Sequence, residues 1–95
     1  MIDPERPLRL AKKARLRFDA RAGQHVLLYP ERGLLLSPSA ARIVEICAEG
    51  LSAAAIVDRI AEEHPEAPRA RVEADVMAFL SVLADRGLLR RPEGA

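Results

Sequence analysis

The sequence is poor in aromatic residues, in cysteine and in long apolar runs. Two phenylalanines and one tyrosine are its only large aromatic side chains, so leucine, isoleucine, valine and alanine must form the core. The single cysteine excludes an internal disulfide and is typical of a reducing compartment. The longest apolar runs, at 26–29 and 34–36, are far shorter than the roughly 20 residues of a membrane helix. Because the first residues also lack a signal-peptide pattern, we expect a cytoplasmic protein without a membrane segment.

Residues that bind metals or attack substrates are equally scarce. His25, Cys47 and His64 lie on three different predicted elements, whereas a metal site needs three or four convergent ligands. Cys47 lies on the apolar side of a predicted helix, which indicates a small buried side chain rather than a nucleophile. The five glycines are widely separated and form no phosphate-binding loop. We therefore expect no enzyme activity, no metal and no cofactor.

The pattern along the chain predicts an α+β fold, with a three-stranded antiparallel sheet followed by three helices, like a winged helix-turn-helix. Strict alternation over 14–19, turn residues at 21–24 and an apolar run at 25–29 predict two paired strands. A third, shorter strand is predicted at 34–36. The three helices are delimited by start and stop residues: 38 to about 49, 52–64 and 69–86.

Particular residues set these helix ends. The hydroxyls of Ser37 and Ser52 can accept hydrogen bonds from first-turn amides, and Pro38 suits the first helical position. Gly50 and Gly87 are typical helix stops.

The predicted domain limits follow from the two ends of the chain. Residues 1–13 contain two prolines and are predicted to form an extended N-terminal arm. Residues 14–91 form the single domain, in which 88–91 is a short strand or an extended tail. Residues 92–95 are expected to fray.

Charge does not favour a nucleic-acid partner. The chain has 15 basic and 14 acidic residues, and the acidic excess lies in the helical half. A DNA-binding domain concentrates positive charge on the helix that enters the groove. The corresponding helix start, residues 69–75, offsets Arg69 and Arg71 with Glu73 and Asp75. A winged-helix DNA-binding regulator is therefore kept only as the alternative function.

The third predicted strand points to a different kind of partner. Leu34, Leu35 and Leu36 place apolar side chains on both faces. If this strand lies at the sheet edge, its free N–H and C=O groups can pair with an added peptide strand. The same pattern fits a strand buried on both faces, and the sequence leaves the two open. An exposed edge also allows a homodimer through edge strands.

Taken together, several segments resemble the PqqD family of pyrroloquinoline quinone (PQQ) biosynthesis. The resemblance rests on these residues: Arg15-Leu16-Arg17-Phe18-Asp19, Val26-Leu27-Leu28-Tyr29-Pro30-Glu31-Arg32, Ser39-Ala40 with Ile43, Glu45-Ile46-Cys47 with Gly50, Asp75-Val76, Phe79-Leu80, Leu83 and Gly87-Leu88-Leu89. It implies a recognition element for ribosomally synthesised peptides (a RiPP recognition element). Such a protein acts as a peptide chaperone, which binds the precursor peptide PqqA and presents it to the radical SAM enzyme PqqE.

The resemblance also implies a site. The peptide would add as a strand against the third strand, in a groove beside the third helix, at Gly33, Leu34, Leu35, Leu36, Val72, Val76, Phe79 and Leu83. Many family members have an acidic residue directly after the cysteine, whereas this chain has Ala48-Glu49 before Gly50. That difference affects the end of the first helix, away from the proposed groove.

Overall fold

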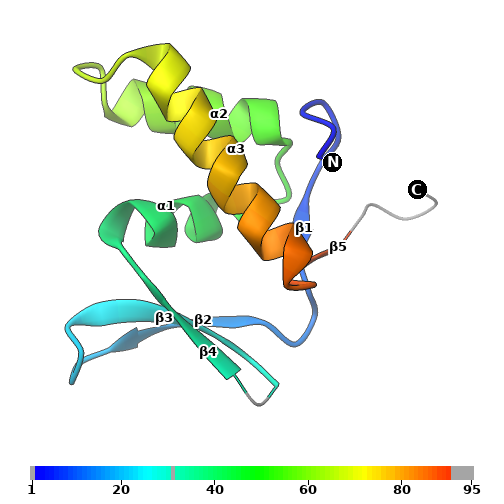
Figure 1. The fold of residues 1–95 in the computed structure, drawn as a ribbon, viewed down its shortest axis with the longest axis vertical. Helices are drawn as coiled ribbons and strands as arrows, with labels where there is room; N and C mark the ends of the chain where they lie inside the picture. The colour runs from blue at the N-terminus through cyan, green and yellow to red at the C-terminus, as the bar shows by residue number, and fades with distance from the viewer. Residues whose placement is uncertain (1, 31, 91–95) are drawn as a thin grey trace.

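The computed structural model describes residues 2–30 and 32–90. Figure 1 shows the order of its elements, which are β1 (Arg9–Leu10), β2 (Arg15–Asp19), β3 (Gln24–Tyr29), β4 (Arg32–Leu36), α1 (Pro38–Cys47), α2 (Ala53–Glu63), α3 (Arg69–Asp85) and β5 (Leu89–Arg90). The predicted α+β class, with a three-stranded antiparallel sheet followed by three helices, is confirmed.

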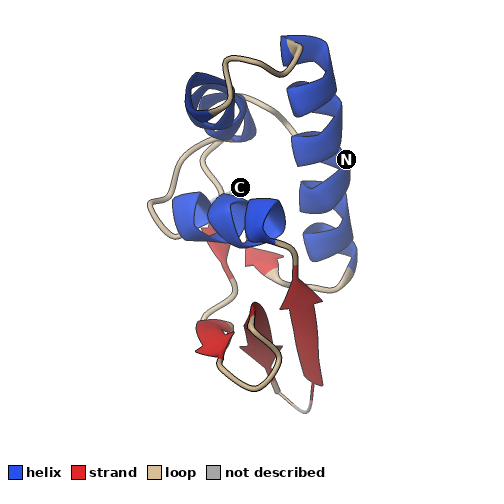
Figure 2. Ribbon diagram, turned by 90° about the vertical axis from the view of Figure 1, so that its left-hand side faces the viewer, coloured by secondary structure: helices blue, strands red, loops and turns tan. Residues whose placement is uncertain are grey.

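The sheet has β3 in the middle and β2 and β4 at its two edges. Strand register aligns two sets of residues, Leu16, Leu27 and Leu34 on one face and Arg17, Val26 and Leu35 on the other. The first set lies on the inner face, which packs on α1 and buries Leu27 and Leu36. The second set lies on the outer face, which no other described element covers (Figures 1 and 2).

Two serine caps start the first two helices as predicted. Ser37 Oγ accepts a hydrogen bond from the Ala40 amide at 3.2 Å, and Ser52 Oγ accepts one from the Ala55 amide at 3.2 Å. Helix α1 ends three residues before Gly50, because the amides of Glu49 and Gly50 bond to carbonyls three residues back. This tighter turn leads into Gly50, which has a φ of 78° that other residues rarely adopt.

The core lies where α1 is enclosed between the sheet and the α2–α3 pair (Figure 2). Its largest fully buried side chains come from the sheet, from all three helices and from the residue before β5: Leu27, Leu36, Ile46, Ile56, Leu80, Leu83 and Leu88. Arg86 also donates a hydrogen bond to the Tyr29 hydroxyl at 3.3 Å, which links the end of α3 to β3. The core and this hydrogen bond together connect the sheet to α3.

The N-terminal segment lies against the rest of the domain and has turns at 4–5 and 12–13 on either side of β1. Leu8 is buried, and its amide donates to the Leu51 carbonyl at 2.9 Å. Residues 9–10 form β1, which pairs with β5 in an antiparallel two-stranded sheet. Nothing in the sequence analysis predicted this pairing. The predicted domain limits stay a prediction, and the tail at 92–95 lies outside the described residues.

Candidate functional site

Strand β4 has one side free for pairing. It bonds to β3 on one side, and among residues 2–30 and 32–90 no strand pairs with its other side. Leu35 on β4 is 57% exposed, so a strand buried on both faces is the wrong interpretation of the three leucines. The main-chain N–H and C=O groups that point away from β3 are available to another strand.

The four site residues predicted on β4 have different environments. Leu36 is 2% exposed and belongs to the core, and Leu34 is half-buried beside it on the inner face. Gly33 and Leu35 lie on the outer face and are exposed. An added strand would therefore meet Leu34 on the side that faces α1 and Leu35 on the side that faces away.

The four site residues predicted on α3 are mostly buried. Val72, Val76 and Leu83 belong to the core, whereas Phe79 is half-buried. Three of the four, Val72, Val76 and Phe79, line a cavity with a volume of about 370 Å³. Leu83 is not among the lining residues.

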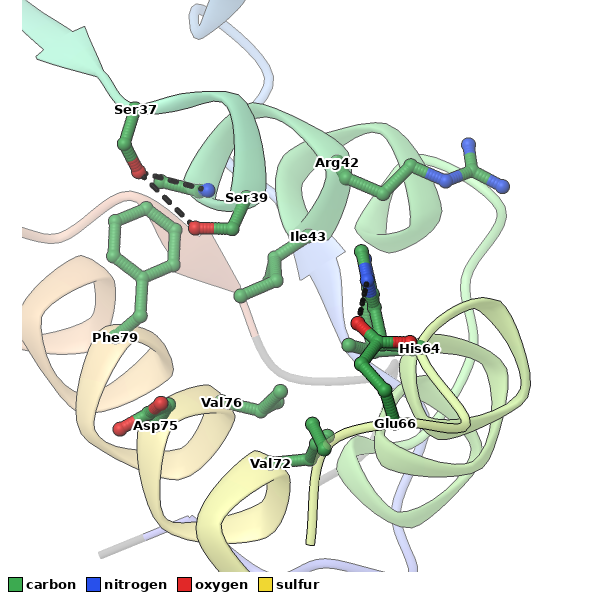
Figure 3. Close-up of a pocket in the computed structure, with 13 residues that line it drawn as sticks. Ser37, Ser39, Arg42, Ile43, His64, Glu66, Val72, Asp75, Val76 and Phe79 are labelled. Atoms are coloured by element: carbon green, nitrogen blue, oxygen red, sulfur yellow. Dashed lines mark hydrogen bonds and ion pairs between the residues drawn. The ribbon is translucent and has the colours of Figure 1, made fainter. Parts of the chain in front are cut away.

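This cavity, which we call the helix cavity, lies between α1, the end of α2 and α3. It is lined by Ser37, Ser39, Ala40, Arg42, Ile43, Ile60, His64, Glu66, Ala67, Val72, Asp75, Val76 and Phe79. Figure 3 shows Ile43, Val72 and Val76 directed into the space from α1 and α3. Ser37, which lines the cavity, directly follows the last residue of β4, so the strand ends beside the cavity. An unpaired strand edge and a mostly apolar cavity are thus neighbours at Ser37.

The charged residues at the rim of the helix cavity differ in how firmly they are paired. Arg42 holds Glu63, with Nε 3.0 Å from each carboxylate oxygen and Nη2 2.6 Å from Oε2. This hydrogen bonding lowers the pKa of Glu63 and raises that of Arg42. Asp75 has only a long contact with Arg71, at 3.9 Å between strongly exposed groups. Arg42 is therefore fixed at the rim, with its guanidinium directed away from the cavity (Figure 3).

Sequence reasoning missed the α1 side of the cavity. Ser39 and Ile43 are four residues apart, so they share the face of α1 that meets α3. The spacing of Ile43 from Ser39 was the available signal. His64 and Ala67, which follow the end of α2, gave no signal, because their place at the cavity depends on how the helices cross.

The environment of Cys47 is the expected one for a structural residue. Its side chain is fully buried in α1, and burial raises the pKa of the thiol to about 12. Within the described ranges, His, Cys, Asp and Glu side chains form no group of three or more that could hold a metal ion. No described helix is long and apolar enough to cross a membrane.

Comparisons with known proteins all point in one direction. Residues 24–89 match the family model described as "Coenzyme PQQ synthesis protein D (PqqD)". A "PqqA binding protein" of Rhodopseudomonas palustris strain HaA2 is 41% identical over 87 residues, which are 92% of this chain and 83% of the relative.

Two solved structures share the fold. One is the solution NMR structure of the PqqD truncation of Methylobacterium extorquens PqqCD, described as a stand-alone RiPP recognition element. It has a TM-score of 0.79 and 30% identity, and the match covers 96% of each chain. The other is TbiB1 in complex with the TbiA(beta) leader peptide, with a TM-score of 0.73, 28% identity, and coverage of 92% of this chain and 96% of that one.

Proposed function

The chain belongs to the PqqD family, and from this membership we propose that it binds the precursor peptide PqqA and presents it to the radical SAM enzyme PqqE. The peptide adds as a strand to the free edge of β4 and places apolar side chains in the helix cavity. The protein itself carries out no turnover. The observation that carries the proposal is an unpaired strand edge that ends, at Ser37, beside an apolar cavity.

The free edge of β4 alone would bind a peptide only weakly, so the helix cavity is needed for affinity. Ordering a flexible peptide costs about 1–2 kcal/mol per residue, whereas each main-chain hydrogen bond returns a net of about 0.5–1.5 kcal/mol. The net binding free energy from strand addition alone is therefore close to zero. Each apolar side chain that becomes buried contributes roughly 1.5–3 kcal/mol, so one or two side chains in the helix cavity supply the affinity and the selectivity. A volume of about 370 Å³ is within the range of ligand pockets.

Two features support this site. TbiB1, which has the same fold, forms a complex with a leader peptide. The half-buried residues Leu34 and Phe79 lie on β4 and α3, the two elements that border the proposed groove, and each leaves part of its apolar surface accessible. A peptide strand laid along β4 would cover both.

The DNA-binding alternative has less support. Arg69 at the start of α3 is paired with Asp58 of α2, and Arg71 lies closest to Asp75. Both arginines thus have carboxylates beside them at the position where a recognition helix would meet phosphates.

Filling the helix cavity tests the proposal. Ala40 lines the cavity on α1 and is half-buried, so Ala40→Phe would occupy the space that the peptide needs. Excluding one apolar side chain of the peptide corresponds to a loss of about tenfold or more in affinity. Calorimetry with a PqqA peptide should show this loss. The matched control is Ala74→Phe, an exposed position on α3 outside the cavity, which should bind like the wild type.

Light scattering distinguishes peptide binding at the β4 edge from pairing of two copies of the chain. Homodimerisation through β4 would use the same free edge, so adding PqqA should shift any dimer to a monomer in light scattering. A wild-type protein that is folded and does not bind PqqA at tens of micromolar would refute the proposed function. Equal affinities for Ala40→Phe and Ala74→Phe would refute the cavity as the site.

A further inference from the structure

The outer face of the sheet carries an apolar cluster that extends from the peptide edge at Leu35 across to β3, beyond the reach of a strand added to β4. Val26 and Leu28 of β3 and Leu35 of β4 share this face, because Val26 is opposite Leu35 and Leu28 is opposite Gly33. Leu28 is 41% exposed and Leu35 is 57% exposed. We call these three residues the outer cluster. It lies on the side of the sheet that faces away from all three helices (Figure 2).

Gly33 keeps the outer cluster accessible. The glycine lies between Leu28 and Leu35 on this face and has no side chain to cover either of them. A Cβ atom at this position would lie 3.4 Å from Val26 Cγ2 and 3.5 Å from Leu28 Cδ2. A side chain there would pack on Val26 and Leu28, so glycine leaves their apolar surface open to an apolar side chain of a partner.

Two arginines border the outer cluster on β2. Arg15 is opposite Leu28 and Arg17 is opposite Val26, so both lie on the outer face. Arg15 donates only to main-chain carbonyls, those of Lys12 at 3.0 Å and Ala14 at 3.4 Å. Within the described part of the chain, neither arginine forms an ion pair with a carboxylate. By contrast, Arg42, Arg59 and Arg69 each form an ion pair with a carboxylate.

The acidic residue nearest to these arginines in sequence is already engaged. Asp19 follows them on β2, and its Oδ1 accepts hydrogen bonds from the amides of Arg21 at 2.9 Å and Ala22 at 3.3 Å. Its role is to close the turn between β2 and β3. Asp19 keeps its negative charge at the turn end of β2, so Arg15 and Arg17 leave a net positive charge beside the apolar centre of the described outer face. Its complement is a protein surface with carboxylates around one or two apolar side chains.

We propose that the outer cluster, with Arg15 and Arg17, is the surface that docks the enzyme that modifies the bound peptide, through a carboxylate-bordered apolar patch on that enzyme. This inference rests on the proposed function, because it names the surface for the second partner. The enzyme then contacts β2 and β3, while the peptide uses the edge of β4 and the helix cavity on the other side of the sheet. Both partners can be bound together.

A second copy of the chain fits this face less well. If two copies paired face to face, Arg15 and Arg17 of each copy would share one interface, and the described strands would bring only the two Asp19 carboxylates to balance four arginines. Like charges in one desolvated interface are unfavourable. A nucleic acid is disfavoured because the centre of the face is apolar and offers phosphates no donor.

Charge reversal at Arg17 tests the docking surface. Arg17→Glu should weaken binding of purified PqqE at least tenfold at low salt, while the affinity for a PqqA peptide in calorimetry stays within twofold of the wild type. The control is Arg71→Glu, which makes the same charge change at an exposed site on α3; it should leave PqqE binding unchanged. Leu28→Ser removes apolar surface without changing charge, and it should weaken PqqE binding at high and low salt alike.

Each other outcome overturns a specific statement. If Arg17→Glu and Leu28→Ser, both with the wild-type thermal midpoint, bind PqqE normally, the outer face is not the docking surface, although PqqA binding survives. If either folded variant loses PqqA as well, the face belongs to the peptide site. A wild-type dimer in light scattering that Arg17→Glu dissociates would assign the face to a second copy. A wild-type chain that binds no PqqA refutes the proposed function itself.

Discussion

The alternation of side chains along β4 can be tested with two neighbouring substitutions. Leu36 is 2% exposed on the inner face, whereas Leu35 is 57% exposed on the outer face. Truncating a buried leucine to alanine costs about 2–5 kcal/mol, because transfer free energy is lost and a cavity remains. Leu35→Lys leaves its ammonium group in water, and a surface change of this kind alters stability by less than about 0.5 kcal/mol.

Thermal unfolding followed by circular dichroism measures the difference. In a domain of this size, 1 kcal/mol corresponds to roughly 4–8 °C in the midpoint. Leu36→Ala should therefore lower Tm by at least about 8 °C, and Leu35→Lys by no more than about 4 °C. A shift of one residue in register would exchange the two faces. If Leu35→Lys costs as much as Leu36→Ala, the register of β4 and the reasoning built on it are refuted.

Two further predictions concern ionisable groups. Cys47 should react with thiol reagents at pH 8 only after unfolding, since it is buried and its pKa is raised to about 12; rapid labelling of the native protein would contradict this. Arg42 lowers the pKa of Glu63 in the folded state, so the pair's stabilising effect is present at neutral pH and is lost as the pH falls below about 4. Glu63→Gln should lower Tm at pH 7, and the difference from the wild type should shrink as the pH falls through the lowered pKa of Glu63; a constant difference would show that ionisation is not the cause.

Local signals in the sequence predicted most of the fold. Ser37 and Ser52 are the caps of α1 and α2, and alternation from residue 15 to 19 marks β2. These signals depend on neighbouring residues only. The pairing of β1 with β5 was missed because it joins Arg9 to Arg90 through strands of two residues, which are too short to show a period.

The site was predictable only in part. Helical spacing places Val72, Val76 and Leu83 on one apolar stripe, and nothing in that stripe tells which of them a partner could reach. The crossing of α1 and α3 decides it, since Val72 and Val76 line the helix cavity and Leu83 does not. Leu35 posed a similar problem, because three consecutive leucines fit a strand covered on both faces as well as one with a free face.

The β1–β5 pair determines how the domain responds to mechanical force. Arg9 and Arg90 are partners, and the chain leaves the pair from these two residues at the same end. A pull on both ends of the chain would first load the bonds that hold Pro4 to Ala54 and Leu8 to Leu51. It would then open the β1–β5 pair like a zipper, one hydrogen bond at a time, instead of shearing all its bonds together. Tension from attached proteins would therefore release the two ends first and reach the sheet that holds the peptide edge only later.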